Sequence, residues 1–128
     1  MSKEHIRKIT LEDFISRKEQ RARSLHDPQP RELYIKSLDG CIEVVEPTLS
    51  QLSDARKLAE ESEEMGNAYI VYQCCPMLHA GELKTGGAPH EAAFAVFKPG
   101  EVAAIAAQLM EMAGYSADNV TVAERLKN

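Results

Sequence analysis

The chain has 128 residues and a mass of 14.2 kDa, the size of one domain that can bury a hydrophobic core of its own. It carries 15 Lys and Arg residues against 20 Asp and Glu residues, so its formal net charge is −5. This acidic balance argues against nucleic acid as a partner, because binding to phosphate is driven by clustered cations. No apolar run reaches the roughly 20 residues that a membrane-spanning helix needs.

The compartment is indicated by the N-terminal residues and the cysteines. The first residues lead into a charged segment rather than the apolar core of a signal peptide. The cysteines are odd in number and two of them are adjacent, which is a poor framework for disulfides: Cys41, Cys74 and Cys75. We therefore expect a cytoplasmic protein with reduced thiols and no membrane association.

Residues 1–30 are expected to form a flexible N-terminal arm with a short helix. Thr10 is a typical N-cap, and Asp13 places a carboxylate in the first turn. A short apolar face follows, formed by Leu11, Phe14 and Ile15. The charged residues after this face are typical of a solvated helix end. The alternative is a docking helix that orders on a partner through Phe14. Two prolines within residues 26–30 then form a linker.

Two strand-like runs, residues 33–38 and 41–45, flank Asp39 and Gly40. An Asp-Gly pair between strands is typical of a two-residue type I′ hairpin turn, because both central residues then have positive φ. The sequence therefore predicts a β-hairpin near the N-terminus of the globular part.

The register that this turn implies places Ile35 opposite Val44 and Lys36 opposite Glu43. The first pair is apolar and should face the core, whereas the second pairs opposite charges in solvent. A single hairpin is not stable alone, so helices are expected to cover its apolar side.

The helical half begins with a capping-box pattern, Thr48 with Gln51 three residues later. The residues that follow separate into an apolar and a charged side, as in an amphipathic surface helix. Gly66, followed by Asn67, is expected to end or bend this helix.

The next segment, residues 67–78, is almost uniformly apolar and contains the adjacent cysteines. Its length of about eleven residues and the proline at its end, Pro76, favour a helix. High β propensity at residues 69–72 leaves a buried strand as the alternative. Either structure makes this segment the buried centre of the domain.

The C-terminal half is expected to contain a glycine-rich loop at residues 79–90 and a short helix at 91–97. Pro99 suits the first position of a longer helix, and Gly114 suits its C-terminal end. One side of that helix is an apolar stripe of Val102, Ile105, Ala106, Leu109 and Ala113. Residues 116–128 form a polar C-terminal tail.

These elements together predict an α+β fold that is mostly α. The globular domain, residues 31–115, is expected to be a small helical bundle with one N-terminal β-hairpin.

The cysteine pair suggests two chemical functions. Adjacent cysteines on a helix point about 100° apart and rarely share a zinc ion, although Cys41, His79 and His90 offer further ligands. A thiol nucleophile needs a base, and His79 is the candidate, but no acidic residue beside it would orient it. We therefore interpret the thiols as core packing and predict no metal, no cofactor and no catalytic residues, with a thiol enzyme or zinc protein as a remote alternative.

Several segments in their order resemble the XkdN-like tail assembly chaperones of contractile-tailed phages and PBSX-like prophages. The resemblance extends from about Thr10 to Tyr115. Its segments are residues 10–14 (TLEDF), 18–20 (KEQ), 35–40 (IKSLDG), 72–78 (YQCCPML), and the stretch from Pro99-Gly100-Glu101 to Ala113-Gly114.

The resemblance implies a non-enzymatic protein that binds and solubilises the tape measure protein during tail assembly and recruits tail tube subunits. A tape measure protein is a long helix with exposed apolar stripes, which a partner shields by helix-in-groove contacts. We expect these contacts at Phe14, Val102, Ile105, Leu109 and Met112. Self-association stays open, and the alternative is a regulatory or structural interaction protein with another client.

Overall fold

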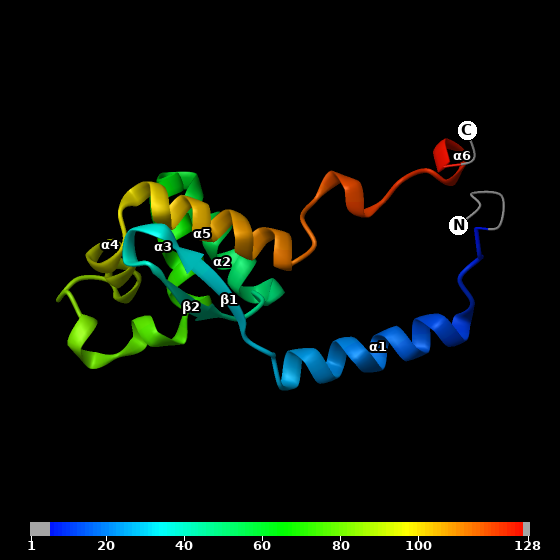
Figure 1. Ribbon diagram of the computed structural model, residues 1–128, viewed down its shortest axis with the longest axis horizontal. Coiled ribbons are helices and arrows are strands. Elements are labelled where there is room, and N and C mark those ends of the chain that lie inside the picture. The colour runs from blue at the N-terminus through cyan, green and yellow to red at the C-terminus, as the bar shows by residue number, and fades with distance from the viewer. Residues whose placement is uncertain (1–5, 127–128) are drawn as a thin grey trace. The chain divides into compact units, whose positions relative to one another are not determined.

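The computed structural model describes residues 6–126 and has the predicted fold class, α+β and mostly helical (Figure 1). Residues 1–5 of the expected arm and 127–128 of the expected tail lie outside the described residues. The chain divides into two compact units. We call Gln29–Gly114 the globular unit, and the second unit combines Met1–Pro28 with Tyr115–Asn128.

Helix α1, Leu11–His26, forms the larger part of the second unit. The predicted cap is confirmed, because the Asp13 backbone N–H donates to the Thr10 hydroxyl at 3.2 Å while the Asp13 carboxylate accepts from the Thr10 backbone N–H at 2.8 Å. The helix is longer than the predicted short one, since the charged residues after Ile15 continue it, and none of its residues is buried. The C-terminal part of this unit contains one further short helix, α6, Ala123–Leu126.

Strands β1, Arg31–Ile35, and β2, Gly40–Val44, form the predicted hairpin as a two-stranded antiparallel sheet. The predicted two-residue turn is wrong. A 3-10 turn at Lys36–Leu38 followed by Asp39 connects the strands, and only Asp39 of the non-glycine residues described has a positive φ, 46°. The Tyr34 hydroxyl donates to the Asp39 carboxylate at 2.7 Å, which holds this longer turn closed.

The predicted register is therefore also wrong. Ile35 lies opposite Gly40, not Val44, and Glu43 lies opposite Glu32, not Lys36. The shift is an even number of residues, so each side chain stays on its predicted side of the sheet. Ile35 and Val44 are both buried, as expected, on the core side.

Helix α2, Leu49–Glu61, begins at the predicted capping box of Thr48 and Gln51. It ends at Ser62, which caps helix α3, Glu63–Cys74. The predicted end at Gly66 is wrong, because Gly66 lies inside α3. A Cβ atom on this glycine would lie 2.8 Å from both the Ala55 carbonyl oxygen and the Ala59 Cβ, so Gly66 allows α2 and α3 to pack closely.

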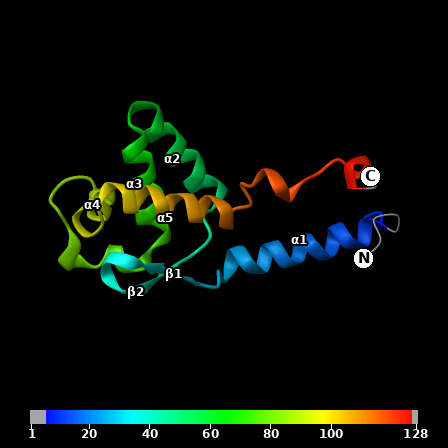
Figure 2. The ribbon, with the colours of Figure 1, turned by 45° about the horizontal axis from the view of Figure 1, so that its top comes forward.

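Helix α3 is the centre of the core, and the helical interpretation of residues 67–78 is confirmed as far as Cys74. A 3-10 turn, Pro76–His79, follows where the proline was expected to stop the helix. The buried residues of α3 include Ala68, Ile70, Val71 and Cys74. The helix packs against α2 and against the last long helix, α5, Pro99–Met112 (Figure 2).

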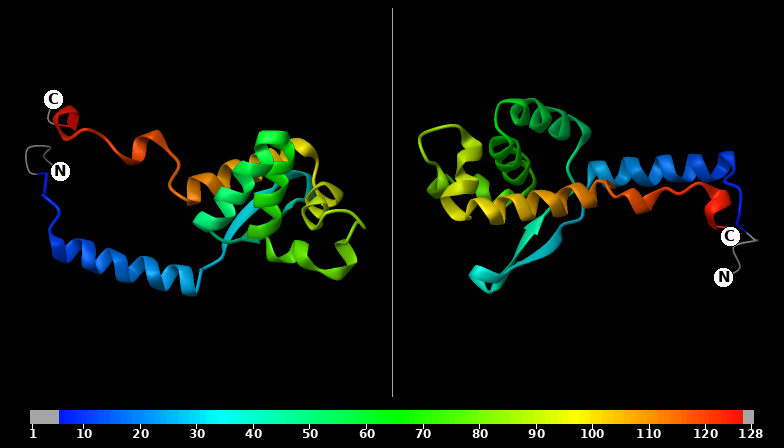
Figure 3. Two further views of the ribbon diagram at one scale, coloured as in Figure 1. Left: turned by 180° about the vertical axis from the view of Figure 1, so that it is seen from behind. Right: turned by 90° about the horizontal axis from the view of Figure 1, so that it is seen from above.

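The glycine-rich segment contains short 3-10 turns at Gly81–Leu83 and Pro89–Glu91, and helix α4, Ala92–Val96, follows. Pro99 occupies the predicted first turn of α5, where the Glu101 carboxylate accepts from the Lys98 backbone N–H at 2.8 Å. Gly114 has φ +91° just after α5, as the prediction of a helix end requires. Helix α5 runs between the hairpin and α2 (Figures 2 and 3).

One hydrophobic cluster joins the inner side of the hairpin to α2, α3, α4 and α5. No polar or charged side chain is buried among residues 6–126. Among these residues no single helix is long and apolar enough to cross a membrane. Two helical segments, Pro89–Val96 and Pro99–Asn119, reach the length and apolar composition of a membrane span only when taken together, and they are bent by 115° relative to each other.

Candidate protein-binding surfaces

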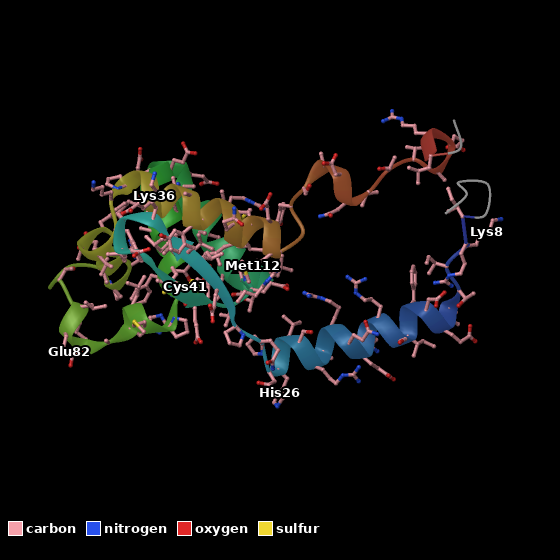
Figure 4. The ribbon with its side chains drawn as sticks, viewed as in Figure 1. Lys8, His26, Lys36, Cys41, Glu82 and Met112 are labelled. Carbon is pink, nitrogen blue, oxygen red and sulfur yellow. The ribbon has the colours of Figure 1, made fainter. Side chains whose placement is uncertain are left out.

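The predicted contact residues separate into core and surface positions. Val102 and Leu109 are 0% exposed and Ile105 is 3% exposed, so this stripe of α5 packs inside the globular unit. Met112 is half-buried near the end of α5 (Figure 4). Phe14 is 68% exposed on α1. Of the five residues, Phe14 alone offers a large apolar surface to a partner in this structure.

The adjacent thiols lie in the core. Cys74 and Cys75 are both buried, and the Cys74 thiol donates to the Gln51 side-chain oxygen at 3.7 Å. Burial, with a smaller contribution from Cys75, raises the pKa of Cys74 to about 12, and burial also raises the pKa of Cys75. Both groups are therefore protonated thiols at neutral pH, which are poor nucleophiles and poor metal ligands.

The histidine that could serve as a base makes other contacts. Nε2 of His79 lies 2.7 Å from the Tyr72 carbonyl oxygen, and the two rings pack with centroids 4.4 Å apart. A hollow of about 230 Å³ beside the glycine-rich loop is lined by Tyr72 and His79, but by neither core cysteine. Within residues 6–126 no three His, Cys, Asp or Glu side chains are grouped to hold a metal ion.

Helix α1 carries an apolar surface that extends beyond the predicted face of Leu11, Phe14 and Ile15. Leu11, Phe14, Ile15, Ala22 and Leu25 recur at i, i+3, i+4, i+11 and i+14, so they share one side of the helix. We call these five residues the arm stripe. Leu11 is 70% exposed, Ile15 49% and Leu25 52%. The same spacing, continued past the charged residues, identifies Ala22 and Leu25 in the sequence.

The C-terminal half of α1 is basic. Residues 16–26 contain Arg17, Lys18, Arg21 and Arg23 with a single acid, Glu19, so their net charge is +3. Lys18 lies on the side of the arm stripe itself, seven residues after Leu11. The globular unit contains six basic and thirteen acidic residues, so its net charge is −7.

A groove of about 460 Å³ lies between β1 and α5 on the globular unit; we call it the β1–α5 groove. Its apolar lining is formed by Leu33, Ile35, Ala104 and Ile105. The charged residues that line it are Glu32, Lys36 and Glu101. Lys36 lies at the hairpin tip (Figure 4). Core residues therefore reach the surface at this groove, although their side chains are mostly covered.

The acidic side of the groove is held in place. Glu101 accepts hydrogen bonds from the Ser37 hydroxyl and the Lys98 backbone N–H, and these bonds lower the pKa of its carboxyl. Glu32 lies directly opposite Glu43, and both are exposed. Like charges at this cross-strand distance are unfavourable, so a cation placed near them would be stabilising.

Searches against protein-family models, curated proteins and solved structures found no match to this chain.

Proposed function

We propose that this protein is a tail assembly chaperone of a phage or prophage, which binds the tape measure protein through α1 in the cytoplasm of the bacterial host. The observation that carries the proposal is the arm stripe. Helix α1 has 16 residues, an apolar side and no buried residue, and the globular unit has a hydrophobic core of its own. Most stability of such a helix in proteins comes from packing its apolar side on something else.

The chemistry of the arm stripe fits a helical client. An apolar stripe of large side chains at helical spacing is the surface that pairs with an amphipathic helix. Phe14 is its only aromatic residue, and aromatic anchors carry much of the energy in such interfaces. The long helices of a tape measure protein offer complementary stripes along their length. The tape measure protein as client and the tail tube protein as second partner are proposed from the sequence resemblance to XkdN-like chaperones, and the proposal includes no enzymatic step.

The test is co-expression with a fragment of the tape measure protein of the same phage or prophage. We expect the chaperone to raise the soluble yield of the fragment and to co-purify with it. Phe14→Asp should abolish both effects, because it places a charge in the arm stripe. Met77→Asp is the matched control, since Met77 is 77% exposed on the globular unit. An unchanged yield with the wild-type protein would contradict the proposal.

Leu109→Asp is unsuitable for this experiment. Leu109 is fully buried, so the variant buries an unpaired charge in the core and loses its fold whatever the client is. A regulatory or structural interaction protein is the second candidate, because the arm stripe by itself does not distinguish between helical clients. It predicts that α1 captures a different protein, with the same dependence on Phe14.

A further inference from the structure

We propose that the protein forms a closed dimer in which α1 of each copy docks its arm stripe in the β1–α5 groove of the second copy. This dimer uses the same arm stripe as the proposed function, but its formation does not depend on the tape measure protein. It assigns an occupant to two surfaces that are both partly apolar and that differ in the sign of their charge, the arm stripe and the β1–α5 groove.

The two surfaces match in size and in apolar character. Helix α1 has 16 residues and is about 24 Å long, whereas the 14 residues of α5 extend about 21 Å. Helix α1 can therefore lie along α5 over most of its length. The groove volume of about 460 Å³ has room for the Phe14 ring and a neighbouring aliphatic side chain, which would contact Leu33 and Ala104.

The charges favour this occupant. The basic half of α1 carries a net charge of +3, and the globular unit carries −7. Lys18 projects from the same side of α1 as the arm stripe, so docking brings it to the groove. The acidic residues that line this groove are Glu32 and Glu101, with Lys36 as the single opposing cation among the lining residues. A cation beside Glu32 also relieves its repulsion with Glu43.

The linker favours a second copy over the same chain. Only residues 27–30 connect α1 to β1, and two of these four residues are prolines. A helix that immediately precedes a strand must reverse direction to lie alongside that strand. Proline fixes its own φ and holds the preceding residue in an extended conformation, which disfavours so tight a reversal. Exchange of the arms between two copies avoids this reversal of the chain. Under two-fold symmetry the same contact between α1 and the groove then forms twice in each dimer.

The test measures the mass of the full chain by sedimentation equilibrium over a range of concentrations. We expect a monomer–dimer equilibrium for the wild type that weakens as salt rises, because the contact joins opposite charges. Phe14→Asp in the arm and Ala104→Arg in the groove should each raise the dimer dissociation constant about tenfold or more. Both residues are exposed, so both variants should keep the wild-type circular dichroism spectrum. Met77→Asp should leave the equilibrium unchanged.

Mixing the two variants gives the decisive result. The arm of the Ala104→Arg chain is intact, and so is the groove of the Phe14→Asp chain, so the mixture should form a heterodimer with one intact contact. Its dissociation constant should lie below that of either variant alone. A monomer at every concentration overturns the proposal. A dimer whose dissociation constant is unchanged by Ala104→Arg also overturns it and would indicate that the two α1 helices pair with each other. A mixture that dissociates as readily as either variant alone overturns it as well.

Discussion

Gly66 of α3 lies so close to Ala59 of α2 that a Cβ atom on the glycine would be 2.8 Å from the Ala59 Cβ. No pair of carbon atoms packs at that distance, so any larger residue at position 66 must push the two helices apart. Because α2 and α3 share the core with the hairpin, the spacing set by this glycine affects the whole globular unit.

Gly66→Ala should therefore destabilise the globular unit although alanine favours helices. Overpacking costs about 1–3 kcal/mol, which exceeds the gain of about 1 kcal/mol in helix propensity. The measurement is urea unfolding followed by circular dichroism at 222 nm. Gly100→Ala is the control, since Gly100 lies in α5 with nothing within 4 Å of the added Cβ. It should be neutral or stabilising, and equal effects of the two variants would contradict the close packing.

The three thiols should differ in reactivity. Cys41 is exposed on β2, whereas Cys74 and Cys75 are buried and have raised pKa values. A disulfide reagent at pH 8 should modify one thiol rapidly in the native protein and the other two only after denaturation. Cys41→Ser should remove the rapid phase. Two or more rapid thiols in the native protein would restore the thiol enzyme as a candidate.

Asp13 should titrate far below an ordinary aspartate. The Arg7 guanidinium and the Thr10 backbone and hydroxyl donate to its carboxylate, and they lower its pKa to about 2. The pKa of Asp13 is lower in the folded protein than in the unfolded chain, so the ionised carboxylate stabilises α1. This stabilisation is complete above the unfolded pKa of about 3.9 and is lost as the pH falls through about 2. Arg7→Ala should raise this midpoint, which an NMR titration of the Asp13 carboxyl carbon would detect. A midpoint near 4 in the wild type would contradict the contact between Arg7 and the Asp13 carboxylate.

Glu32→Lys should change stability and dimerisation in opposite directions. It replaces a like-charged cross-strand pair with an attractive one, which stabilises the hairpin by about 0.2–1 kcal/mol. The same change removes an acid from the β1–α5 groove, so the dimer should weaken. Urea unfolding and sedimentation equilibrium measure the two effects. Glu82→Lys, an exposed substitution outside the groove, should produce neither effect.

Local signals in the sequence were sufficient for the starts of α1, α2 and α5 and for the end of α3. Thr48 with Gln51, and Thr10 with Asp13, form the predicted caps because a capping box involves only residues three apart. Pro76 and Pro99 stand where proline chemistry places them, one after a helix and one at the start of another.

The errors arose where distant residues decide the structure. The Asp-Gly pair predicted a tight turn, but Ser37 reaches Glu101, 64 residues later, and a 3-10 turn replaced the type I′ turn. Gly66 was interpreted as a helix end because its real role, contact with α2, is not visible in the local sequence. Each error reflects a tertiary contact that overrides a local preference.

The candidate binding residues were also hard to identify from local sequence alone. The stripe of Val102, Ile105 and Leu109 has the spacing of both a core helix and a binding helix, and spacing alone does not separate these roles. Burial separates them, since the three residues lie in the core while Phe14 remains exposed. The stripe on α1 is less evident in the sequence because charged residues interrupt it between Ile15 and Ala22.

The central claim is that α1 is the surface that binds the tape measure helix. Hydrogen exchange followed by mass spectrometry tests it most directly, with the full chain at a concentration where it is monomeric, first alone and then saturated with a soluble tape measure fragment. We predict that slowed exchange on binding is concentrated in peptides covering residues 11–26 and is absent in Phe14→Asp. Binding that slows exchange only in the globular unit, with α1 unchanged, would contradict the claim.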